Sequence, residues 1–196
     1  TPNAAIIIGS TGGIGAAPFV VTFNADADVS IVGAVMANIR FWVAGDAPST
    51  ATRTVEAVLT DGDGGTSLTA TKQITVTAIN DAPTITNLSG DSLAYSEGAG
   101  AVVIEQGTNA VVADVDSANF DTGTLTASFT AGSDSAEDLL GIRNQGTGAG
   151  QIGVAGSNVS YAGATIGTFA GGSAGVNLVI TLNASATPTA VTALVR

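Results

Sequence analysis

The chain contains no cysteine and no histidine. Without these residues there is no disulfide bond, no Ser-His-Asp or Cys-His catalytic group, and no usual ligand set for zinc or iron–sulfur clusters. A sequence without thiols is compatible with a bacterial protein that works outside the cell. These absences indicate a protein that is not an enzyme.

Basic residues are scarce. Five Lys and Arg stand against 16 Asp and Glu, which gives a formal net charge of -11. Such a surface repels nucleic acids and anionic membranes, and divalent cations are its natural counter-ions. No apolar run reaches the ~18 residues of a membrane-spanning segment. We therefore expect neither nucleic-acid binding nor membrane insertion.

Aromatic residues are also few, with six Phe, two Tyr and one Trp in 196 residues. The core must therefore be built mainly from Val, Ile, Leu and Ala. The only plausible acid/base pair of a glycosidase is Glu97 with Glu105, and no aromatic platform for a sugar accompanies it. An exposed aromatic cluster around Trp42 or Tyr161 would instead favour a carbohydrate- or protein-binding module.

What is abundant is internal similarity. Val21-Thr-Phe-Asn-Ala-Asp-Ala27 matches Ile180-Thr-Leu-Asn-Ala-Ser-Ala186, 159 residues later, and identities continue at Val32/Val191 and Ala34/Ala193. With a slip of one residue, Ile8-Gly-Ser10 matches Ile166-Gly-Thr168. The chain therefore begins and ends within the same element of a repeat about 159 residues long.

Short stretches of alternating apolar and polar residues, separated by Gly, Asn and Asp, predict an all-β fold. Helical turns are expected at residues 30–37, 187–194 and 136–141, with Pro188 at a first helical position. Strands are expected at residues 19–23, 38–43, 53–60, 72–79, 101–105, 110–115, 123–129, 151–154, 158–161 and 177–183. Many short strands with such turns are typical of β-sandwiches.

Several motifs resemble a known family when they are taken in order. Asp61-Gly-Asp-Gly-Gly65 and Thr75-Val-Thr-Ala-Ile-Asn-Asp-Ala-Pro83 resemble the end of a bacterial cadherin-like repeat. Tyr95-Ser-Glu-Gly98 and Val112-Ala-Asp-Val-Asp116 resemble the opening of the next repeat. The resemblance implies Ig/cadherin-like β-sandwich modules of large secreted or surface adhesins and matrix proteins, in which calcium stiffens the junctions between modules.

The expected calcium ligands are oxygen donors near this junction. Calcium takes about six to eight oxygens from carboxylates, amides and carbonyls. The candidates are Asp61, Asp63, Asn80, Asp81, Glu97, Asp114 and Asp116. Asp114 and Asp116 are two residues apart and would point to one side of an extended strand. The alternative is that these acids only form turns and strand ends.

The phase of the repeat predicts two incomplete modules. Residues 1–83 are the C-terminal part of one repeat, and residues 84–196 are the N-terminal part of the next. The missing strands leave edges that invite strand addition. The chain would then close on itself as a circular permutant, complete a neighbouring chain in a head-to-tail filament, or be a simple fragment. The expected function is that of a calcium-stiffened spacer or fibre subunit at the bacterial surface.

Overall fold

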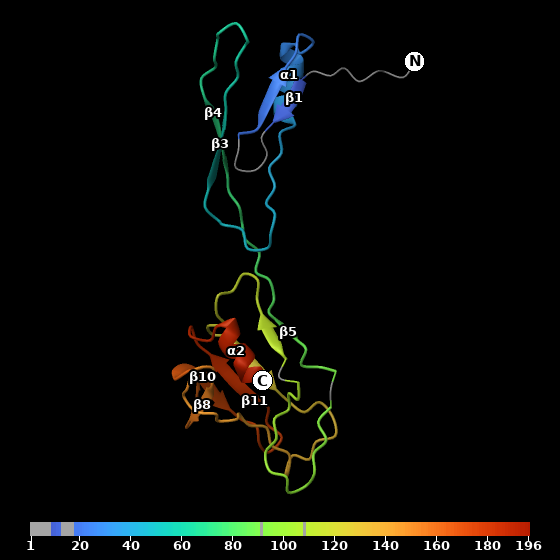
Figure 1. The fold of residues 1–196 in the computed structure, drawn as a ribbon, viewed down its shortest axis with the longest axis vertical. Coiled ribbons are helices and arrows are strands. Elements are labelled where there is room, and N and C mark those ends of the chain that lie inside the picture. Colours follow the sequence, from blue (N-terminus) through green and yellow to red (C-terminus); the bar gives the residue numbers. More distant parts are fainter. Residues whose placement is uncertain (1–8, 13–17, 91, 108) are drawn as a thin grey trace, which may run out of the picture. The chain divides into compact units, whose positions relative to one another are not determined.

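The computed structural model describes residues 9–12, 18–90, 92–107 and 109–196. These residues form short strands and two short helices, so the predicted all-β character is confirmed (Figure 1). Packing divides the chain into two compact units, Thr1–Ala44 and Gly45–Arg196. This division does not follow the phase of the repeat, and the predicted boundary at residues 83 and 84 stays a prediction.

The first unit contains a two-stranded hairpin and a helix. Strand β1 (Gly9–Gly12) pairs antiparallel with β2 (Val20–Phe23), and helix α1 (Val29–Ala37) follows. The helix begins at Asp28 because its carboxylate accepts the Ile31 N–H at 2.8 Å, which satisfies one of the free donors of the first turn. None of the described side chains in residues 18–44 is buried.

A second hairpin opens the larger unit. Strand β3 (Arg53–Ala57) pairs antiparallel with β4 (Ala70–Ile74), and the bridge between Thr60 and Thr66 extends the pairing toward the turn. The Gly-rich sequence between the strands forms the expected turn. Among the described residues, these two strands form a sheet of their own.

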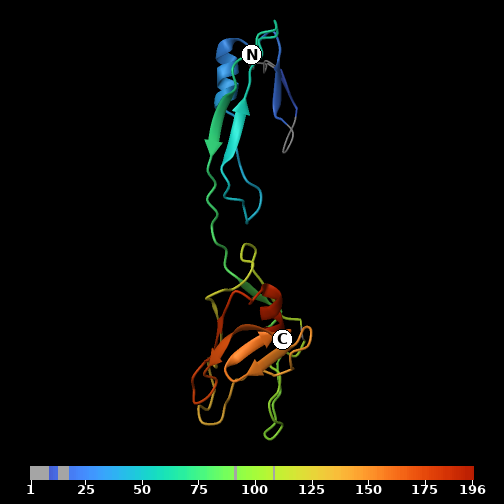
Figure 2. The ribbon, with the colours of Figure 1, turned by 90° about the vertical axis from the view of Figure 1, so that its left-hand side faces the viewer.

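The remaining strands build the part of the chain that holds the core. Five strands form one antiparallel sheet in the order β7-β11-β10-β9-β8, and β5 pairs separately with β6. The helix α2 (Pro188–Val195) contacts β6 and β9 (Figure 2). The strand bounds are β5 Thr84–Thr86, β6 Val111–Ala113, β7 Thr124–Ala127, β8 Ile152–Ala155, β9 Asn158–Tyr161, β10 Ala164–Ala170 and β11 Leu178–Leu182.

The core lies between this sheet, β6 and α2. Val159 and Ile166 are the largest side chains that are fully buried. Ile166 lies where the β9–β10 register shifts, between Thr165 and Gly167, so a local irregularity of the sheet accompanies its burial. The rest of the buried cluster is aliphatic, as expected from the shortage of aromatic residues: Val112, Ile152, Leu178, Ile180, Leu182, Ala186, Ala190 and Val191.

Three local predictions are wrong. Residues 38–43 and 101–105 form no strand, because neither pairs with another segment among the described residues. Residues 136–141 form turns rather than a helix. There the Asp134 carboxylate accepts the Ala136 N–H at 2.8 Å, and the Leu140 N–H donates to Gly172 in another segment at 2.8 Å. The Asp138 N–H donates to the Asp134 carbonyl at 2.8 Å, so one helical turn forms, and the bond from Leu140 to Gly172 takes the chain away before a second turn.

Candidate functional site

Three of the seven predicted ligands come together where the linker ends. The Asp81 N–H donates to Oδ2 of Asp116 at 3.1 Å, which joins the end of the linker to the loop after β6. Oδ1 of Asp114 accepts the N–H groups of Asp116 and Ser117 at 3.2 and 2.9 Å. Asp81, Asp114 and Asp116 are all half-buried. These contacts bring three of the seven predicted ligands together, and the calcium site itself stays a prediction.

The electrostatics of Asp114 follow from these contacts. Desolvation is the largest single influence and raises the pKa of its carboxyl group. The backbone N–H donors of Asp116 and Ser117, helped by the side chains of both residues, favour the carboxylate, and together they lower the pKa below its ordinary value. Asp114 is therefore a charged acceptor that organises the loop.

The other predicted ligands are parts of separate turns. Oδ1 of Asp61 accepts the N–H groups of Asp63 and Gly65 at 3.0 and 2.9 Å and so closes the β3–β4 turn. This turn is at the closed end of the hairpin, whereas the linker leaves from its open end. Asn80 donates through its side chain to the Asp81 carbonyl at 2.8 Å. Glu97 is exposed in a turn between β5 and β6.

The residues present offer only oxygen donors, which suit calcium in kind. Within the described ranges, however, no group of three or more acidic side chains is arranged to hold an ion. Two of the junction carboxylates already accept backbone N–H groups through one oxygen each. The turn-forming role of these acids is therefore visible in the structure, and the calcium site stays a prediction.

Among the residues whose burial the structure describes, Glu105 is the one charged residue with a buried side chain, and 3% of its surface is exposed. One carboxylate oxygen accepts the Asn109 N–H at 3.1 Å, and within the described part of the chain the other has no hydrogen-bond partner. The sequence singled out Glu105 only as an acid/base candidate. Its burial depends on the turn that precedes β6, which no local pattern indicated.

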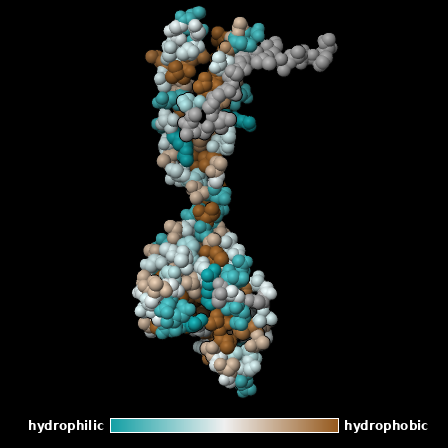
Figure 3. Space-filling model, in the orientation of Figure 1, coloured by the Kyte–Doolittle hydropathy of each residue, from teal (hydrophilic) through white to brown (hydrophobic). Residues whose placement is uncertain are grey.

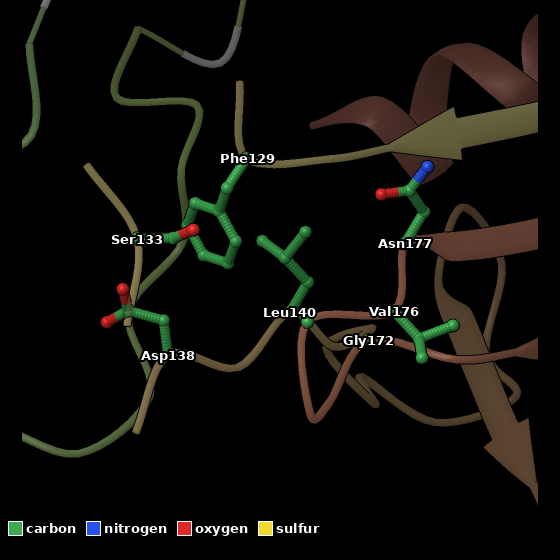
Figure 4. Close-up of a pocket in the computed structure, with 8 residues that line it drawn as sticks. Phe129, Ser133, Asp138, Leu140, Gly172, Val176 and Asn177 are labelled. Atoms are coloured by element: carbon green, nitrogen blue, oxygen red, sulfur yellow. The ribbon is translucent and has the colours of Figure 1, made fainter. Parts of the chain in front are cut away.

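Among the hollows formed by the described residues of the larger unit, two differ clearly in size and lining. The first has a volume of about 40 Å³ and is lined by Phe129, Asp138, Leu140 and Val176, among others (Figure 4). It has room for little more than water. The second, of about 330 Å³, lies beside α2 and is lined by Arg143, Gln145, Tyr161, Thr192 and Arg196, together with smaller residues. It therefore gathers two of the five basic residues of an acidic chain.

The two copies of the repeated element have the same local structure. In β1–β2 the register pairs Gly9 with Phe23, and in β10–β11 it pairs Gly167 with Leu182. These are the pairs expected from the sequence alignment with its one-residue slip. The helices begin alike, since Thr187 accepts the Ala190 N–H at 3.3 Å, as Asp28 does for Ile31.

The copies differ in what covers them. In the second copy Leu178 is 5% exposed, whereas its equivalent in the first copy, Phe19, is 54% exposed. Figure 3 shows that apolar residues also lie at the molecular surface. We call the equivalents of the second copy's buried residues the N-terminal apolar face: Phe19, Val21, Phe23, Ile31 and Val32.

No helix in the described ranges is long and apolar enough to cross a membrane. Comparisons of the chain with protein-family models, curated proteins and solved structures found no match.

Proposed function

We propose that this chain is a structural module of an extracellular bacterial repeat protein and acts as a spacer or fibre subunit rather than as an enzyme. The observation that carries the proposal is the repetition of one hairpin and helix, with the same register and the same cap, 159 residues apart. A repeated fold that is joined through a short linker suits a protein that spans distance. The proposed architecture is an Ig/cadherin-like β-sandwich, secreted or held at the cell surface.

The acidic surface and the junction contacts support this role. The hydrogen bond between Asp81 and Asp116 fixes the linker to the module that follows it. Calcium remains part of the proposal, as an ion that the linker acids would bind and that would tighten the same contact. At about 100 times its dissociation constant, one bound ion adds ~2.7 kcal/mol to the free energy of unfolding. Magnesium is the control, because it demands a more regular octahedral site.

The test is a concatenated chain in which residues 1–159 are repeated twice ahead of residues 1–196. Small-angle X-ray scattering would measure its maximum dimension and that of the single chain, each with chelator and with millimolar calcium. A spacer predicts an equal increase in length for each added repeat. A particle that stays compact as repeats are added would contradict the proposal, and an unchanged scattering profile and melting temperature in calcium would remove the metal from it.

A second candidate function is favoured by the groove beside α2. A carbohydrate- or protein-binding module would use Arg143, Arg196 and Tyr161, two cationic groups and one aromatic ring that line the same hollow. Such groups bind carboxylates and stack on sugar rings. Calorimetric titration with an oligogalacturonate and with a neutral oligosaccharide tests this candidate. Binding should require the acidic sugar and be lost in Arg143→Ala but not in Arg40→Ala, which removes the same charge elsewhere.

A further inference from the structure

The N-terminal apolar face has a counterpart whose covering is visible in the same chain. In the second copy, β11 pairs on its outer edge with β7, with Ile180 opposite Leu125 and Leu178 opposite Ala127. The contact continues beyond the strand, because the Phe120 N–H donates to the Ala186 carbonyl at 2.9 Å. The segment that contains β7 therefore covers both the strand and the loop before α2.

Backbone geometry shows which edge of the first copy is open. Leu182 donates its N–H to Gly123 at 2.9 Å and accepts the Thr122 N–H at 3.2 Å, so both polar groups point toward β7. Phe23 has the same position and register in β2, whose sheet contains only β1 and β2 among the described residues. Along an antiparallel strand, the backbone N–H and C=O groups of successive residues point to opposite edges. The N–H and C=O of Phe23 therefore point away from β1, to the open edge of β2.

The covering of the helix is equally specific. In the second copy, α2 contacts β6, and Ala190 and Val191 are buried there. The matching residues of α1 are Ile31 and Val32, and neither is buried. Within the part of the chain that the structure describes, the first copy thus presents both an unpaired strand edge and a helix face, and the equivalents of both belong to the core of the second unit. A partner that satisfies both must supply a β7-like strand and a β6-like strand together.

We infer that the N-terminal apolar face is a binding surface for a polypeptide equivalent to residues 84–166 of another repeat. The occupant adds a β7-like strand beside β2 and lays a β6-like strand on α1, which reproduces the interface that the chain already forms around β11 and α2. The inference rests on the proposed function, since it identifies the partner of a repeat module. It goes further in assigning the residues that receive that partner.

The test transplants the first copy into the position of the second. In the full chain, residues 167–196 are replaced by residues 9–37, so that the transplanted β2 stands beside β7. Amide hydrogen exchange of β7 is the readout, because those amides are protected only when a strand pairs with them. We expect one cooperative thermal transition and slow exchange in β7, as in the unchanged chain.

Matched variants within the transplanted copy test the geometry. Phe23→Asp, at the position of buried Leu182, should abolish protection of β7, whereas Thr22→Asp, at the position of exposed Thr181, should preserve it. Ile31→Ala gives the transplanted helix the smaller side chain that Ala190 has at this position. It therefore shows whether a failed transplant results from steric crowding by Ile31 or from a wrong assignment of the binding surface. Loss of β7 protection in both the transplant and its Ile31→Ala form would overturn the inference.

The outcome is separable from that of the proposed function. If the concatenated chain lengthens by equal steps while both transplants leave β7 unprotected, the spacer function is supported and the proposed binding surface is contradicted. If the transplant protects β7 while the concatenated chain stays compact, the proposed binding surface is supported and the spacer function is contradicted.

Discussion

Val191 and Val32 offer a direct comparison of burial, because they are the same residue at the same position of the repeat. Val191 lies in α2 and is 3% exposed, because it packs into the core, whereas Val32 in α1 is only half-buried. Val191→Ala removes two methyl groups at ~0.8 kcal/mol each and leaves a small cavity, so we expect a loss of about 2 kcal/mol in the free energy of unfolding. Val32→Ala should cost less than about 0.5 kcal/mol.

The assay is urea unfolding followed by far-ultraviolet circular dichroism, with thermal unfolding as the second measurement. At roughly 4 °C for each kcal/mol, Val191→Ala should lower the melting temperature by about 8 °C. The midpoint should move without a change in the dependence on denaturant, because the surface exposed on unfolding is nearly unchanged. Equal effects of the two substitutions would refute the claim that only the second copy contributes to a packed core.

Three further predictions concern single residues. Gly172→Ala should destabilise the chain by about 2 kcal/mol or more, because Gly172 has a φ of +86° and an added Cβ would meet the Leu140 carbonyl. Gly156→Ala, at a φ of +60° in open space, should cost about 1 kcal/mol when both variants are compared by urea unfolding. Thr187→Ala should cost about 1 kcal/mol through loss of the α2 cap, and an unchanged urea midpoint would contradict this. Asp114→Asn should be less stable than the unchanged chain near neutral pH. The pKa of Asp114 is lower in the folded chain than in the unfolded chain, so its carboxylate contributes stability that is lost on protonation, and the difference between the two chains should shrink as the pH falls below about 4. A difference in stability that is constant with pH would argue against a charged Asp114.

The elements that the sequence predicted well are those whose cause is local. Pro188 at the start of α2 and alternation in β11 depend on neighbouring residues, and both appear close to where they were expected. The repeat found in the sequence is matched by the structure, because Gly9 pairs with Phe23 as the equivalent Gly167 pairs with Leu182. Local pattern and internal similarity were sufficient for these features.

The features that were missed depend on partners distant in sequence. Residues 101–105 are a short run of mainly β-branched apolar residues, which is typical of a strand, yet no described segment pairs with them. Burial of Glu105 and the contact of Leu140 with Gly172 also need segments that only the folded chain brings together. The sequence named Asp81, Asp114 and Asp116 as calcium ligands, which stays a prediction, and their use as acceptors of backbone N–H groups depends on loop geometry. Spacing alone does not determine this.

The central claim is that the same element is completed in one copy and open in the other. Amide hydrogen exchange resolved along the chain measures this directly, by comparing residues 20–37 with residues 179–196. The account predicts slow exchange in β11 and α2 and fast exchange in β2 and α1 of the single chain, despite their common sequence and register. Equal protection of the two copies would contradict it.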